Sequence, residues 1–178
     1  SSANTICVLD TGVDYDHPLL KNALIDHIDL STDGDSRDFK GHGTFVSGIA
    51  AYRELENRGV FSPSAKIISV KVDSRDGTEE SYLESYIEEA VQRYSHISKI
   101  FNLSVLYPIK SKSDYPSDLT YTIDDLAKRH DVLFVVSSGN LEEEIADFRL
   151  DHYPLYLSDN KCAVYCGADA STSITVGG

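Results

Sequence analysis

Five short apolar runs, separated by segments with helical periodicity, constrain the fold of this chain more than any other feature. The runs are rich in Val and Ile, and they lie at 5–9, 66–72, 97–103, 132–136 and 173–176. Several of them are apolar without alternation, which is typical of strands buried on both faces. The sequence therefore predicts a mostly parallel sheet.

The segments between these runs carry helical patterns. Apolar residues recur at spacings of three and four within 44–54, 80–94 and 117–130, and Ser117 is a candidate N-cap. Alternating strands and helices predict a doubly wound α/β fold with helices flanking the sheet. No interdomain linker or internal repeat is visible, so we expect one domain over 1–178.

The charge of the chain excludes some classes of partner. The 178 residues include 16 basic and 29 acidic side chains, a net charge of −13. Nucleic-acid binders usually have the opposite sign, and an acidic surface repels anionic lipid headgroups. No run of 18 apolar residues indicates a membrane span. We therefore expect neither nucleic acid nor a membrane as partner.

Three cysteines are too few for a disulfide scaffold, and they leave a secreted or a cytoplasmic location open. Cys7 lies in an apolar run and is expected to be buried. Cys162 and Cys166 are interpreted as unpaired thiols, with a disulfide or a metal site as the alternative. The aspartate-rich segment 29–38 is interpreted as a solvated turn, with a calcium loop as the alternative.

Polar side chains follow three of the predicted strands. Asp10 ends the first, Asn102 and Ser104 end a middle one, and Asn140 follows a later one, while His42 opens a helix between two glycines. Because ligands gather at the carboxyl ends of parallel strands, these groups are candidate site residues. Asp10 could orient His42 as a general base, and the Asn140 amide could point at an anionic intermediate.

The combination of these motifs resembles the subtilisin-like serine proteases. The matching segments keep the order of that family, and they are 8–13 with 17–18, 41–50, 102–104, 135–140 and 174–178. The resemblance implies a serine endopeptidase with a subtilisin-like α/β fold, in which Asp10 orients His42 and Asn140 stabilises the oxyanion. It also implies a peptide or protein substrate, bound by residues Asn102, Ser104, Val105, Leu106 and Gly139.

The nucleophile that the resemblance requires is missing, because no Gly-Thr-Ser occurs in the sequence. We expect 1–178 to be a partial peptidase domain, incomplete at its C-terminus and inactive by itself. The serine would then lie in a C-terminal fragment or segment outside this chain. The absence of Met agrees with a processed piece.

Other positions also depart from the family pattern. Leu19 stands where many members carry a calcium-binding aspartate, so a structural calcium is possible but not certain, and no other cofactor is implied. Phe45 replaces a common histidine and is expected to pack in the core. Leu106 replaces a glycine that usually admits the substrate side chain, which is expected to alter the usual preference.

Two other functions remain as alternatives. Oxygen and nitrogen ligands for a metal-dependent hydrolase could come from Asp10, Asp14, Asp16, His17 and His42. A noncatalytic binding domain with a protease-like fold is the other alternative. If the chain is a protease, acidic residues at 73, 76, 79–80 and 142–144 could favour basic peptides, or they could simply provide a soluble surface.

Overall fold

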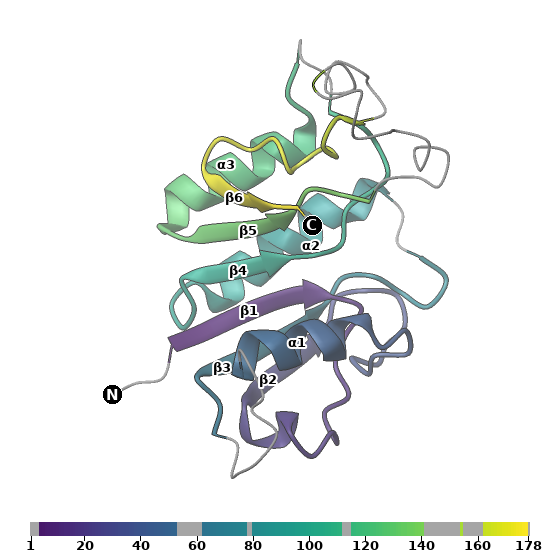
Figure 1. The fold of residues 1–178 in the computed structure, drawn as a ribbon, viewed down its shortest axis with the longest axis vertical. Coiled ribbons are helices and arrows are strands. Elements are labelled where there is room, and N and C mark those ends of the chain that lie inside the picture. Colours follow the sequence, from purple (N-terminus) through teal and green to yellow (C-terminus); the bar gives the residue numbers. More distant parts are fainter. Residues whose placement is uncertain are drawn as a thin grey trace.

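The computed structural model describes residues 4–52, 62–77, 80–111, 115–140, 154 and 162–177. These residues form a six-stranded sheet in the order β2-β3-β1-β4-β5-β6, and every pair of neighbouring strands is parallel (Figure 1). The strands are β1 (Asn4–Asp10), β2 (Leu24–Asp29), β3 (Ala65–Lys71), β4 (Ile100–Leu103), β5 (Leu133–Ser137) and β6 (Ser173–Val176).

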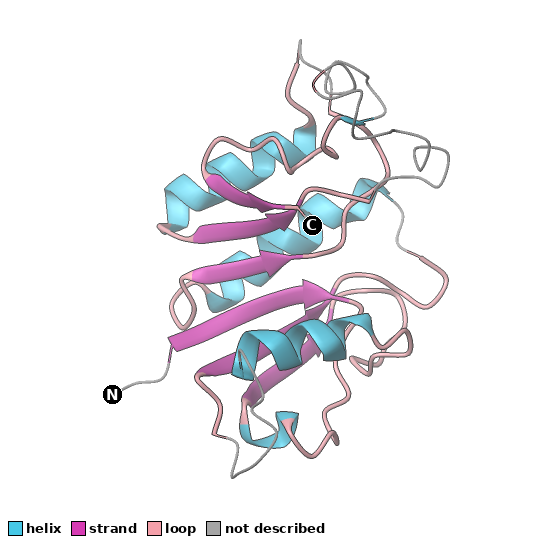
Figure 2. Cartoon of the chain, viewed as in Figure 1, coloured by secondary structure: helices cyan, strands magenta, loops and turns pink. Residues whose placement is uncertain are grey.

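Helices cover both faces of the sheet, as Figure 2 shows in cyan. Helix α1 (His42–Tyr52) packs on one face, whereas α2 (Glu80–Tyr94) and α3 (Asp118–His130) pack together on the other, and a short 3₁₀ turn, η1, spans Leu20–Asn22. The predicted doubly wound α/β fold is thus confirmed. In the described parts of the chain, no helix combines the length and apolarity needed to cross a bilayer.

Residues of the central strand β1 are buried on both of its faces. Cys7 and Leu9 belong to the larger apolar cluster, on the side of α2 and α3, and Val8 belongs to a smaller cluster on the side of α1. All three are 0% exposed. Burying side chains of this kind contributes about 1.5–3 kcal/mol each. Burial on both faces explains why the run is apolar without alternation.

The predicted helices are present, with small shifts at their ends. Helix α2 has the predicted bounds, and the side chain of Ser117 accepts the Thr120 N–H as the N-cap of α3. Helix α1 begins at His42 rather than at 44. Strand β4 begins at Ile100 rather than at 97, because Ile97 and Ser98 still bond to the carbonyl of Tyr94 at the end of α2.

Strand β2 is the one described strand that the sequence pattern did not predict. Its sequence, LIDHID, places three charged or titratable side chains in six positions, and its residues are half-buried or exposed. Its polar side chains interrupt the apolar run, so it lacks the signal that identified the other strands. It pairs with β3 and carries the chain into the aspartate-rich segment.

Candidate active site

The parallel pairing brings the predicted site segments to one edge of the sheet. Strand β1 lies beside β4, and β4 lies beside β5. In register, Leu9 pairs with Leu103, which in turn pairs with Val136. The residues that follow these three positions therefore leave the sheet at the same carboxyl edge, where α/β proteins bind ligands.

His42 and Asp10 form a direct contact at this edge. The Nδ1 atom of His42 lies 2.7 Å from Oδ1 of Asp10, and the same Oδ1 accepts the Thr11 N–H at 2.7 Å. The Asp10 side chain is 0% exposed, whereas that of His42 is 53% exposed. A buried carboxylate thus faces one ring nitrogen of an accessible imidazole, the arrangement that fixes its tautomer and leaves Nε2 available to a substrate.

Burial raises the pKa of the Asp10 carboxyl, and the bonds from His42 and Thr11 counter only part of that effect. Its second oxygen, Oδ2, has no hydrogen-bond partner among the described residues. Hydrogen bonds from His42 and Thr11 thus offset part of the cost of burying this carboxyl. The pair therefore holds the imidazole of His42 in one orientation, as a general base requires.

Asp38 fixes the start of the helix that carries His42. One oxygen accepts the Gly41 N–H at 2.8 Å and the Thr11 hydroxyl at 2.9 Å, and the other accepts the Thr44 N–H at 2.8 Å. Burial alone would raise the pKa of Asp38, but these bonds together lower it. Asp38 was not predicted from the sequence, although an Asp shortly before a helix is a usual capping signal.

Close backbone packing also fixes the distance between α1 and β1. The Gly43 N–H donates to the Thr11 hydroxyl at 2.9 Å. A Cβ atom at Gly43 would lie 2.2 Å from the carbonyl oxygen of Gly12. Only glycine allows the helix to start so close to the end of β1, and this closeness is what brings His42 to Asp10.

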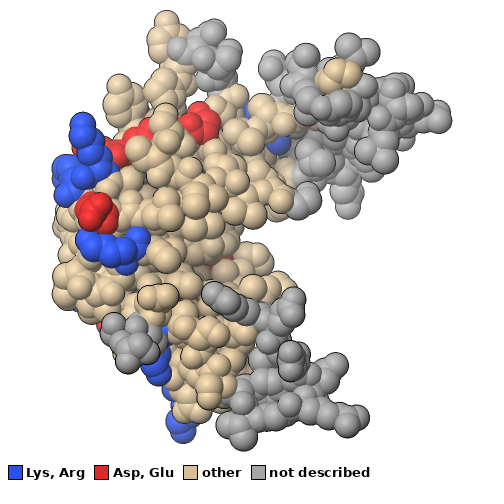
Figure 3. All heavy atoms as spheres, turned by 60° about the vertical axis from the view of Figure 1, so that its left-hand side comes forward, with Lys and Arg blue, Asp and Glu red and all other residues tan. Residues whose placement is uncertain are grey.

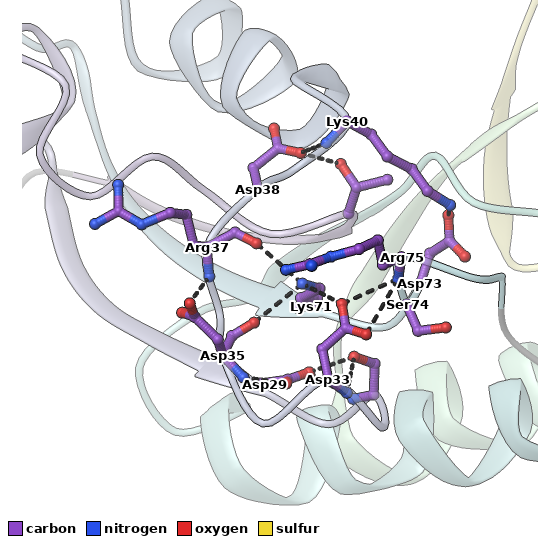
Figure 4. A network of polar contacts seen from close by, with 12 residues as sticks. Asp29, Asp33, Asp35, Arg37, Asp38, Lys40, Lys71, Asp73, Ser74 and Arg75 are labelled. Carbon is purple, nitrogen blue, oxygen red and sulfur yellow. Dashed lines mark hydrogen bonds and ion pairs between the residues drawn. The ribbon is translucent and has the colours of Figure 1, made fainter.

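The aspartate-rich segment 29–38 is organised around a buried lysine (Figure 4). The Lys71 side chain is 1% exposed, and its Nζ donates to Oδ2 of Asp33 at 2.7 Å and to the carbonyls of Asp35 at 3.0 Å and Arg37 at 2.9 Å. The hydrogen bond from Lys71 is the main cause of the lowered pKa of Asp33. The expected solvated turn is thus a half-buried loop with an ammonium group at its centre.

The residues present do not fit a calcium ion at these positions. Lys71 already occupies the oxygen cage of the loop, and Asp14 and Asp16 pair with Arg37 at 3.0 and 2.8 Å. Leu19 supplies only a carbonyl, which accepts the Tyr52 hydroxyl at 2.5 Å. Within the described residues, no group of three or more His, Cys, Asp or Glu could hold a metal.

The segment after β5 rests on an aromatic ring. Gly139 has φ of 93°, and a Cβ atom there would lie 2.4 Å from the ring of Tyr165. The Tyr165 hydroxyl donates to the carbonyl of Asn140 at 2.8 Å, and Asn140 itself is exposed. Tyr165 therefore supports the turn that presents Asn140, a role that no sequence motif indicated.

The segment after β4 is anchored to its neighbours. Asn102 Nδ2 donates to Ser104 Oγ at 2.8 Å, and the Ser104 N–H reaches the carbonyl of Leu9 at 3.5 Å. Val105 and Leu106 are half-buried and pack against the larger apolar cluster. The segment continues the direction of β4 toward the same edge as Asp10 and Asn140.

The expectation that Phe45 packs in the core is wrong. Its side chain is 66% exposed, and Ile49, one turn further along α1, is 54% exposed. Some apolar side chains of α1 face the sheet, and others face away from it. On the side that faces away, a groove of about 370 Å³ lies between the helix and Leu19. The pattern alone could not tell which apolar side chains face the sheet.

The predictions that Cys7 is buried and that Cys162 and Cys166 are unpaired thiols are confirmed. Cys7 is 0% exposed, and burial raises the pKa of its thiol. Cys162 and Cys166 are half-buried free thiols rather than a disulfide.

The charged residues near the carboxyl edge are mixed rather than uniformly acidic. Asp73 forms an ion pair with Lys40 at 2.7 Å, and Arg75 lies over the ring of Phe39 at 3.7 Å. Figure 3 shows the other side of the molecule, toward the amino ends of the strands, and there too the described acidic and basic side chains form small groups of both signs. Glu79 and residues 142–144 lie outside the described residues. The ion pair at Asp73 reduces its contribution to an acidic field.

Fold and site together define an α/β protein with an aspartate–histidine pair at the carboxyl edge of its sheet. The sequence matches the subtilase family over residues 1–178. The chain belongs to this family.

Curated relatives carry names that agree with this assignment. A thermophilic serine proteinase of Bacillus sp. (strain AK1) is 40% identical over 81 residues, which are 44% of this chain and 20% of that protein. An intracellular serine protease of Paenibacillus polymyxa is 38% identical over 79 residues, which are 41% of this chain and 24% of that protein. The chain thus spans about a quarter or less of the length of these relatives.

Solved structures show the same fold. A lanthipeptide protease aligns with a TM-score of 0.68 at 20% identity, covering 98% of this chain and 48% of that one. A cold-adapted subtilisin-like serine proteinase aligns with a TM-score of 0.55 at 24% identity, covering 79% of this chain and 48% of that one. These alignments confirm a subtilisin-like arrangement of the sheet and helices.

Proposed function

We propose that this chain contributes Asp10 and His42 to the Asp-His-Ser triad of a serine endopeptidase. The observation that carries the proposal is the 2.7 Å contact between Nδ1 of the half-exposed His42 and Oδ1 of the fully buried Asp10. The Nδ1–H group donates a hydrogen bond to the carboxylate and keeps its proton, so Nε2 is left as the acceptor. Membership of the subtilase family supports the reaction class.

The nucleophilic serine comes from a segment outside this sequence, which contains no Gly-Thr-Ser. The exposed apolar side chains of α1 support a covering segment of this kind, because Phe45 and Ile49 lie on the helix that carries His42. An apolar groove beside them, of about 370 Å³, would be filled by that segment. Residues 1–178 by themselves are inactive because they hold a base without its nucleophile.

Peptide hydrolysis then follows in two steps. The serine Oγ attacks the scissile carbonyl carbon as its proton passes to Nε2 of His42, and His42 returns the proton to the leaving amine. Water hydrolyses the acyl-enzyme with His42 as base again. The Asn140 amide donates to the oxyanion, and loss of such a donor typically costs ~10²–10³ in kcat.

The substrate binds as an extended strand beside Ser104, Val105 and Leu106, between this segment and Gly139. The support is topological, since β4 and β5 are neighbours and both segments leave the sheet at the edge where Asp10 ends. Main-chain bonds to an added strand bind peptides largely independently of their side chains. Asn102 positions Ser104 through its bond to Oγ.

The test uses the complete protein, including the segment that supplies the serine. We expect it to hydrolyse peptides and to react with a fluorophosphonate probe, and we expect His42→Ala to lose both properties. Asp73→Asn, which removes a nearby carboxylate outside the triad, should retain both. A protein that binds peptides without cleaving them or reacting with the probe would instead be the noncatalytic binding domain.

A further inference from the structure

A cleft at the carboxyl edge of the sheet adjoins the turn of Gly139 and Asn140. It has a volume of about 480 Å³, and its described walls include Lys110, both turn residues, Cys162 and Val176. Cavities of about 300–1,000 Å³ accept small ligands or side chains of any size. The volume of this cleft therefore does not select a side chain, and its chemical groups must do so.

Lys110 carries the one charge among the described lining residues of this cleft. Its Nζ lies 4.3 Å from the centroid of the Tyr165 ring, and it forms no ion pair with any described carboxylate. The ring restrains the ammonium group without neutralising it. A half-buried cation beside a cleft is attracted to an anionic group that enters the cleft.

Tyr165 links this cation to the turn that the proposed mechanism uses. Lys110 and Tyr165 form an isolated antiparallel bridge, the Tyr165 ring lies under Gly139, and its hydroxyl donates to the carbonyl of Asn140 at 2.8 Å. The position of the Lys110 ammonium is therefore fixed relative to Asn140. When the scissile carbonyl of a substrate is bound at Asn140, the side chain of the substrate residue that carries this carbonyl lies at the cleft, because Asn140 also lines the cleft.

We infer that Lys110 is a specificity-determining residue, which selects substrates with Glu or Asp as the residue that provides the scissile carbonyl. This inference rests on the proposed peptidase function. The side-chain carboxylate enters the cleft and pairs with the Lys110 ammonium. An amide of the same size, as in Gln, fills the same space without the charge, and a Lys side chain meets a like charge.

The experiment compares peptides that differ only in this residue, as Glu, Gln or Lys, with the complete protein. We expect kcat/KM for the Glu peptide to exceed that for the Gln peptide by about tenfold, and rising salt to reduce this ratio. Lys110→Gln should abolish the ratio, Lys110→Arg should keep it, and Lys110→Glu should shift the preference to the Lys peptide. A reversed preference cannot result from a loss of folding.

Lys128→Gln is the matched control, because it removes one exposed lysine near the end of α3, at the opposite edge of the sheet. Its Glu-to-Gln ratio should equal that of the unmodified protein. A ratio near one in the unmodified protein, or one that Lys110→Gln leaves intact, overturns the role of Lys110 and leaves the peptidase function standing. Failure to cleave any of the peptides, together with failure to react with a fluorophosphonate, overturns both.

Discussion

Lys71 Nζ lies 2.7 Å from Oδ2 of Asp33, and this pair sits inside the loop that leads to Asp38, the cap of the His42 helix. The pair joins the end of β3 to a segment that follows β2. Because Lys71 also donates to two carbonyls of the same loop, one ammonium group fixes several backbone positions upstream of the site. Disturbing it is therefore expected to affect both stability and the site.

Lys71→Met tests how much this buried cation stabilises the fold. The substitution leaves the Asp33 carboxylate and two carbonyls without their donor, so we expect a loss of about 2–4 kcal/mol in the free energy of unfolding. Urea denaturation measures it. Lys66→Met is the control on the same strand, since Lys66 makes one exposed bond to the carbonyl of Asn22 and should cost under ~1 kcal/mol. Equal losses for the two variants would contradict this role.

Asp33→Asn tests the pH dependence of the same pair. The hydrogen bond from Lys71 lowers the pKa of Asp33 in the folded protein. A lowered pKa stabilises the fold above the unfolded value of about 4, and this contribution disappears as the pH falls through the folded pKa. Wild type should therefore melt at a higher temperature than Asp33→Asn at pH near 7, and the difference should shrink as the pH falls below the unfolded value. A Tm difference that is constant with pH would rule out the ionic contribution.

Asp10→Asn tests the orientation of His42. The Asn side chain can donate to Nδ1, which places the ring proton on Nε2 and removes the acceptor that a serine needs. We expect kcat of the complete protein to fall by ~10⁴ on a peptide substrate. Asp14→Asn changes a carboxylate that is 41% exposed and pairs with Arg37, so its kcat should stay within about twofold. Similar rates for the two variants would show that Asp10 does not act through His42.

Gly139→Ala tests the turn that presents Asn140. The added Cβ meets both a positive φ and the Tyr165 ring, so we expect about 2–3 kcal/mol of destabilisation together with a loss of peptidase activity. Gly34→Ala is the matched control, because Gly34 also has positive φ, 70°, but an added methyl group there would meet no atom within 4 Å. It should cost only about 1 kcal/mol and leave activity intact. Thermal melts and kcat/KM distinguish the two.

Local patterns were sufficient to predict much of this structure. The strands of the sheet interior and helix α2 were predictable because burial on one or both faces leaves a regular apolar pattern. The role of Ser117 as the N-cap of α3 was predictable because capping is a local interaction. The contact between Asp10 and His42 could be expected because β1 ends at the carboxyl edge of the sheet, where a helix that follows a strand in such a fold begins.

Other features depend on contacts between distant segments, and no local pattern reveals them. The burial of Lys71 is set by a loop from another part of the chain, whereas a lysine in a strand usually lies at the surface. The exposure of Phe45 depends on which side of α1 faces the sheet. Strand β2 has too few apolar residues for a strand pattern, and it is held in the sheet by pairing with β3, which follows it by about forty residues. Asp38 caps a helix that begins only after an intervening turn.

The order of the strands also governs how quickly this fold can form. Residues of β1 pair with 65–71 on one side and with 100–103 on the other, so the first strand of the chain completes its hydrogen bonds only when far later segments arrive. Closing such long loops costs entropy before any contact is gained, and folding rates fall as the separation of contacting residues grows. The sheet that unites the site at one edge therefore makes folding of the chain slow.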